Sequence, residues 1–110
     1  MDDKELLTFA AKAAGIPDKA LPHSGSDWIK WLPLDDDGDA LRLAVKLRLT
    51  IEPNYSWEVK GDMTTSVPHE SITCGSKYDE DWSEEIYNDD PYAATRRAIV
   101  RAVAEIGKRS

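Results

Sequence analysis

The chain has 110 residues, of which 41% are hydrophobic and 32% charged, and its formal net charge at pH 7 is −7. This length fits a single domain spanning residues 1–110, and the acidic balance argues against direct binding to nucleic acid, which needs a basic surface. Because Cys74 is the only cysteine, an intramolecular disulfide and a structural zinc site built on cysteines are excluded.

The N-terminus and the hydropathy pattern predict a cytoplasmic protein. Residues 1–5 lack the positive start and apolar run of a secretory signal peptide. No stretch approaches the ~20 apolar residues that a membrane span requires. A lone cysteine favours a reducing compartment. We therefore expect a soluble chain that does not associate with membranes.

Residues 3–14 are expected to form the first helix. Apolar residues recur there at spacings of three and four, at Leu6, Leu7, Ala10, Ala13 and Ala14. Asp2 or Asp3 can cap the helix start, and Gly15 is the expected end.

A linker is predicted over residues 15–27, which are rich in Gly, Pro, Ser and Asp. The apolar run W-I-K-W-L-P-L follows, from Trp28 to Leu34. Packing of Trp28 and Trp31 over the edge of the core is the favoured interpretation. The alternative is an aromatic shelf that binds a ligand together with nearby carboxylates.

The acidic segment Asp35–Asp39 is expected to introduce a second helix over residues 37–48, with acidic residues at its start and basic residues at its end. Its apolar face is predicted to contain Leu41, Leu43, Ala44, Val45 and Leu47. A calcium-binding loop is excluded because Pro33 and Ala44 stand where that loop needs side-chain ligands. A turn with a helix cap is the interpretation that remains.

Strand signals begin after this helix. Residues 49–52 and 55–60 alternate between apolar and polar side chains, and the turn signal Pro53–Asn54 separates them. They predict an antiparallel hairpin with Tyr55, Trp57 and Val59 on one face.

Two further strands are predicted after an irregular segment. Residues 63–70 are expected to be irregular because Pro68 excludes a central strand there. A short strand is predicted at residues 71–74, ended by Gly75, and an edge strand at residues 82–87.

The last helix follows Asp89 or Asp90, with Pro91 at its first position, and Gly107 is expected to end it. Its buried stripe is predicted to contain Tyr92, Thr95, Ile99, Ala102, Val103 and Ile106. The fold class is therefore α+β, with an antiparallel sheet of three to four strands and three helices in the order ααβββ(β)α. One face of the sheet is free to contact water if helices cover only the other face.

No catalytic, cofactor-binding or metal-ligating residue can be assigned. His23 and His69 stand beside prolines without partners at metal-ligand spacing. Isolated glycines form no phosphate-binding loop, and Cys74 is interpreted as a buried strand residue. Arg97 could contribute to a phosphate-binding stripe, but pairing with the chain's own acidic residues is favoured.

A cluster of carboxylates near the end of the sheet is the candidate interaction surface. It contains Asp79, Glu80, Asp81, Glu84, Glu85, Asp89 and Asp90. A solvated acidic face is the default interpretation, and a surface that binds a protein partner is the sharper alternative. Acid–base catalysis by such carboxylates needs a cleft that separates their pKa values, which the sequence does not predict.

Two blocks resemble a known family. W-L-P-L-D-D-D-G-D-A-L-R-L-A-V-K-L (Trp31–Leu47) and D-P-Y-A-A-T-R-R-A-I-V-R-A-V-A-E-I-G (Asp90–Gly107) are similar to motifs of small phage and prophage proteins. That family is described as a phage αβα-sandwich domain and has no established activity. The resemblance implies αβα layering and carries over no functional residue. The region Pro53–Tyr87 departs from it, being longer and more acidic.

These observations favour a non-catalytic phage accessory protein without a cofactor. It is expected to bind and modulate a host protein in the bacterial cytoplasm through its acidic surface. The alternatives are a small ligand-binding or enzymatic domain that uses Trp28, Trp31 and nearby carboxylates, and a phage structural or assembly protein. The oligomeric state is left open.

Overall fold

The computed structural model describes residues 2–60, 65–76, 82–87 and 89–109, and of residues 55–60 and 65–69 it describes the backbone alone. The elements are α1 (Asp3–Ala14), a 3₁₀ turn η1 (Asp18–Ala20), α2 (Asp37–Lys46), β1 (Thr50–Lys60), β2 (Thr65–Gly75), β3 (Ser83–Ile86) and α3 (Pro91–Arg109). The described residues thus form three α-helices and one three-stranded antiparallel sheet, which confirms the predicted α+β class.

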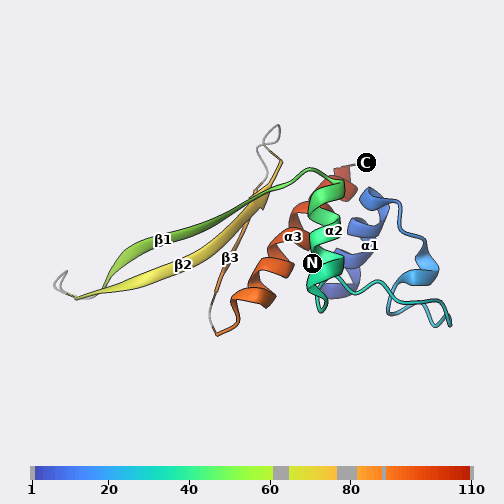
Figure 1. Ribbon diagram of the computed structural model, residues 1–110, viewed down its shortest axis with the longest axis horizontal. Helices are drawn as coiled ribbons and strands as arrows, with labels where there is room; N and C mark the ends of the chain where they lie inside the picture. The colour runs from blue at the N-terminus through green and yellow to red at the C-terminus, as the bar shows by residue number, and fades with distance from the viewer. Residues whose placement is uncertain (1, 61–64, 77–81, 88, 110) are drawn as a thin grey trace.

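Helix α3 occupies the centre of the fold. It packs against β2 and β3 on one side and against α1 and α2 on the other. All three helices lie on the same side of the sheet (Figure 1). The helices therefore cover only one face of the sheet, which is the arrangement that leaves the other face free.

The sheet has the strand order β1-β2-β3. β1 and β2 form a long hairpin that extends away from the helices (Figure 1). β2 pairs with β1 along its whole length, from Thr65 to Gly75, but with β3 only from Ser71 to Cys74. β2 is therefore a central strand only at its C-terminal end.

Two predictions about proline were wrong for the same reason. β1 runs through Pro53, where a turn was expected, and β2 includes Pro68, where an irregular segment was expected. β1 is an edge strand, and β2 has a neighbour on one side only at Pro68. Proline fits such positions because it lacks only the N–H donor, and one side of the strand needs no donor. The side chains of Tyr55, Trp57 and Val59, predicted to share a face, lie outside the described ones, as does that of His69.

The predicted bounds of α1 are confirmed. The Asp2 carboxylate accepts a hydrogen bond from the Glu5 backbone N–H at 2.9 Å and caps the helix start. Gly15 has the left-handed φ of 72° at its end. At α3, Asp90 is the cap, since its carboxylate accepts from the Ala93 N–H at 3.0 Å.

Gly107 does not end α3, contrary to prediction, because the helix continues to Arg109. Gly107 is buried, and a Cβ atom on it would lie 1.8 Å from the carbonyl oxygen of Phe9 in α1. The glycine therefore allows the backbones of α1 and α3 to approach each other. Small residues dominate the buried surface of this helix, which contains Ala94, Ala98, Ile99, Val100, Ala102, Val103, Ala104 and Gly107.

The buried face of α2 differs from the predicted one. Its buried residues are Ala40, Leu43 and Ala44, whereas Leu41 is 58% exposed and Val45 is 70% exposed. Ala40, Leu43 and Ala44 belong to the core cluster, so the face of α2 that carries Leu43 is the one that packs inside. Tyr92, predicted to belong to the buried stripe of α3, is likewise 70% exposed.

The loop between η1 and α2 also departs in part from expectation. Trp31 packs against the core, as predicted, but Trp28 is 50% exposed and does not. The Trp31 N–H donates to the Ala20 carbonyl at 2.8 Å and closes the loop. Among the described residues, no helix has the length and apolarity needed to cross a membrane.

Candidate functional site

An open cleft of about 460 Å³ lies where four segments meet near the start of α3. Its acidic residues come from the first turn of α1, the turn before α2, the end of β3 and the segment leading into α3. They are Asp3, Asp35, Glu85, Asp89 and Asp90, with Arg97 as the single basic residue of the lining. We call this set the acidic cleft.

Helix starts and turns explain why acidic residues gather there. Asp3 lies in the first turn of α1, and Asp90 caps α3. Carboxylates are stabilised at such positions by the N–H groups and the positive end of the helix dipole. Asp35 belongs to a turn in which its N–H donates to the Leu32 carbonyl at 3.0 Å. Local signals therefore place Asp3, Asp35 and Asp90, and packing brings their segments together.

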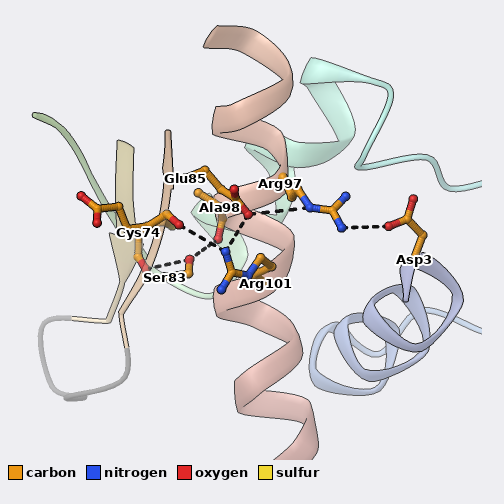
Figure 2. A network of polar contacts seen from close by, with 8 residues as sticks. Asp3, Cys74, Ser83, Glu85, Arg97, Ala98 and Arg101 are labelled. Atoms are coloured by element: carbon orange, nitrogen blue, oxygen red, sulfur yellow. Dashed lines mark hydrogen bonds and ion pairs between the residues drawn. The ribbon is translucent and has the colours of Figure 1, made fainter. Parts of the chain in front are cut away.

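Arg97 links three elements inside the cleft. Its Nη2 atom lies 3.1 Å from an Asp3 oxygen, and its Nε atom lies 3.7 Å from a Glu85 oxygen. Arg101 approaches the same Glu85 oxygen at 2.6 Å (Figure 2). The prediction that Arg97 pairs with the chain's own carboxylates is confirmed. Glu85 therefore serves mainly to hold β3 against α3.

Asp35 and Asp89 give the cleft its unbalanced charge. Both side chains belong to exposed residues, and neither is among the carboxylates that form ion pairs in the described part of the chain. Arg97 approaches Asp3 and Glu85. The carboxylates of Asp35, Asp89 and the helix-capping Asp90 therefore give the lining a net negative charge. The cleft is suited to a positively charged group.

The predicted interaction surface coincides only partly with this cleft. Glu85, Asp89 and Asp90 line it. Glu84 accepts a hydrogen bond from the Ser71 hydroxyl at 2.8 Å and is not part of the lining. Asp79, Glu80 and Asp81 lie outside the described residues. Asp3 and Asp35 were missed because no pattern in a single sequence connects positions so far apart.

The acidic run before α2 acts as a cap, as predicted. The Asp36 carboxylate accepts from the Asp39 N–H at 2.8 Å, and the Asp39 carboxylate accepts from the Leu32 N–H at 2.9 Å and from Arg42 at 2.8 Å. Burial alone would raise the pKa of Asp39, but the hydrogen bonds from Leu32 and Arg42 hold it below its ordinary value.

Cys74 is fully buried in β2, as predicted. Burial raises the pKa of its thiol to about 12, so the group is protonated at neutral pH and is a poor nucleophile. Beside it, the Ser83 hydroxyl donates to the Ala98 carbonyl at 2.6 Å and joins β3 to α3 (Figure 2). Within the described part of the chain, no group of three or more His, Cys, Asp or Glu side chains is placed to hold a metal ion.

The tryptophan pair does not line the cleft. Trp28 stacks under the ammonium group of Lys19, whose Nζ lies 3.8 Å from the ring centroid. Neither the acidic cleft nor a second hollow beside α2 is lined by Trp28 or Trp31. These two cavities therefore give no support to an aromatic ligand shelf.

Comparisons with protein-family models, with curated proteins and with solved structures found no match to this chain. The resemblance to the phage αβα-sandwich family stays a prediction.

Proposed function

We propose that the protein is a non-catalytic binding module whose acidic cleft takes up a basic segment of a protein partner. The observation that carries the proposal is the convergence of carboxylates from four separate segments on one open cleft. Together with the resemblance to small phage proteins, it leads us to propose a host protein as that partner.

The lining of the cleft suits a lysine or arginine side chain. Leu34, Ile86 and Ala93 provide apolar contacts for the aliphatic stem, while Asp35 and Asp89 attract the charged end. A partner that inserts such a side chain gains an ion pair without leaving its methylene groups in water. The described lining contains no histidine, serine or cysteine.

Charge-neutralising variants test the proposal in pull-downs from bacterial lysate. The double variant Asp35→Asn/Asp89→Asn removes two cleft charges whose side chains hold no described element in place. The wild type should retain its partner at low salt and release it at high salt, because dissolved ions screen the attraction between exposed charges, beyond ~10 Å already at 0.1 M. The double variant should fail to retain that partner at low salt.

The matched control is Glu52→Gln/Glu105→Gln, which removes the same charge outside the cleft. It should retain the partner. Binding of a labelled lysine–alanine peptide, measured by fluorescence anisotropy, provides a defined probe for the same comparison. Equal binding by the cleft variant and the control would contradict the proposal.

A further inference from the structure

The three helices of the protein start at one end of the molecule. An Asp3 oxygen in the first turn of α1 lies 3.1 Å from Nη2 of Arg97 in α3. An Asp37 oxygen in the first turn of α2 lies 2.7 Å from Nη1 of Arg96, the preceding residue of α3. Both arginines belong to the first half of α3. The acidic cleft lies at this end, since Asp3 and Arg97 line it.

The helices also end together, at the opposite end of the molecule. The Lys46 ammonium group, in the last turn of α2, donates to the carbonyl of Ala14 at the end of α1. Gly107, in the last turn of α3, packs against Phe9 in the second half of α1. The three helices therefore run in the same direction (Figure 1).

Basic residues gather where the helices end. The last turn of each helix contains lysine or arginine and no aspartate or glutamate. A cation at this position is stabilised by the negative end of the helix dipole, and parallel packing brings three such ends together. With Arg48, which lies just beyond α2, the exposed basic residues at this end are Lys12, Lys46, Arg48, Lys108 and Arg109. We call this set the basic pole.

Arg48 and Lys108 give the basic pole charge that a partner can reach. Both are exposed, and neither has an ion pair or a side-chain hydrogen bond with another residue in the described part of the chain. Arg48 has a φ of 55° and is the only residue other than glycine with a positive φ in the described chain. Glycine is the usual residue at such a helix end, so the arginine adds a charge where the backbone favours no side chain.

We propose that the basic pole of one copy of the chain docks into the acidic cleft of a second copy. This inference rests on the proposed function, because it gives the same cleft a second occupant that competes with the host partner. The two surfaces lie at opposite ends of the helices, so a docked pair still has one free cleft and one free pole. Such a head-to-tail contact builds rings or open chains rather than a two-fold dimer.

Charge complementarity selects a second copy as this occupant. The cleft presents Asp35 and Asp89, and the basic pole presents Arg48 and Lys108. The cleft is open and, at about 460 Å³, has room for more than one long side chain. Because the net charge of the chain is −7, two copies repel each other in other orientations, and docking of the pole on the cleft brings opposite charges together.

Sedimentation velocity of the full chain, from micromolar to millimolar concentration, tests the contact. The sedimentation coefficient of the wild type should rise with concentration at ~0.1 M salt and stay that of a monomer at ~1 M salt, where charges are screened within ~3 Å. The pole variant Arg48→Glu/Lys108→Glu and the cleft variant Asp35→Asn/Asp89→Asn should each raise the dissociation constant about tenfold or more, since each removes the ion pairs of the contact.

The matched control for the pole variant is Lys4→Glu/Lys60→Glu. It makes the same change in net charge, but Lys4 lies in the first turn of α1 and Lys60 at the end of β1, away from the basic pole. This control should associate as the wild type does. Loss of association in the control to the same extent as in the pole variant would overturn the proposal, because net charge alone would then explain both.

A mixing experiment tests the direction of the contact. The pole variant keeps its acidic cleft, and the cleft variant keeps its basic pole. Mixed in equal amounts, they should form a one-to-one dimer that grows no further, because the second cleft and the second pole of that dimer are the altered ones. A mixture that stays as monomeric as its two components would overturn the proposal, as would a wild type that stays monomeric at millimolar concentration.

The labelled lysine–alanine peptide separates this inference from the proposed function. The peptide should bind the pole variant, whose cleft is intact, and in excess it should dissociate the wild-type assembly. Peptide binding without association of copies would overturn this inference and leave the proposed function standing. Association of copies without peptide binding would support this inference and contradict the proposed function. Circular dichroism establishes that each variant is folded.

Discussion

Gly107 determines how closely α1 and α3 can pack. Since a Cβ atom at this position would lie 1.8 Å from the Phe9 carbonyl oxygen, any side chain must push the two helices apart. The contact is with backbone, which cannot rotate away as a flexible side chain can. The packing of α1 against α3 therefore requires a residue without a side chain at position 107.

We expect Gly107→Ala to lower the free energy of unfolding by about 2 kcal/mol or more, as overpacking of a close-packed core does. Urea denaturation followed by circular dichroism measures the effect. Gly38→Ala is the matched control in α2, where a Cβ would meet only side-chain atoms of Asp36 and Arg42. It should be neutral or slightly stabilising, because alanine favours helix by ~1 kcal/mol. Equal stability of the Gly107 variant and the wild type would contradict the close approach.

Cys74 provides a second test at the residue scale. With a pKa near 12 and no exposed surface, the native thiol should resist alkylation by iodoacetamide at pH 8 and react after denaturation. Since the pKa is raised above its ordinary value of 9.0, the unfolded chain ionises first. Stability should therefore decrease as the pH rises above 9, and Cys74→Ala should remove that part of the pH dependence. Rapid labelling of the folded protein would contradict the burial.

At the scale of the element, α2 combines three functions along 10 residues. Its start is capped by Asp36, its inner face packs into the core through Ala40, Leu43 and Ala44, and its outer face leaves Leu41 and Val45 exposed. The apolar pattern predicted this helix but not its orientation, since both faces contain apolar residues. Leu41 and Val45 were expected inside, but the face that carries Ala40, Leu43 and Ala44 is the buried one.

The end of α2 yields a prediction about stability. Arg48→Gly should raise the free energy of unfolding by about 1 kcal/mol, because a left-handed backbone costs roughly 1–2 kcal/mol for a residue with a Cβ atom. Arg48→Ala is the control, since it removes the same charge and keeps the strain, and it should leave stability unchanged. Chemical denaturation of the two variants measures the difference. Equal effects of both variants would show that charge, not backbone strain, governs this position.

At the scale of the whole molecule, α3 and the adjoining end of the sheet form the structural centre. Helices lie on one side of α3 and strands on the other. The far part of the β1–β2 hairpin extends away from this centre (Figure 1). The acidic cleft lies at the opposite end of α3 from Gly107, where loops and helix starts converge.

Amide hydrogen exchange should follow this organisation. The N–H groups of Ser71–Cys74, in the part of β2 with neighbours on both sides, should be among the best protected, together with those of α3. Amides of residues 65–69 should exchange faster, because β2 has only β1 beside it there and opens more readily. Mass spectrometry of peptic peptides can compare the two halves of β2. Equal protection along the strand would contradict this arrangement.

The sequence by itself determined that there are helices in these three places, and it narrowed two helix starts to Asp2 or Asp3 and to Asp89 or Asp90 and one helix end to Gly15, because caps involve groups only a few residues apart. It also determined the α+β class and the burial of Cys74. The tertiary structure alone decided which face of α2 is buried, that Gly107 lies within a helix crossing, and that Asp3 and Asp35 meet Asp89. Those outcomes depend on how segments distant in the sequence pack together, and local patterns of polarity and helix or strand propensity do not predict that packing.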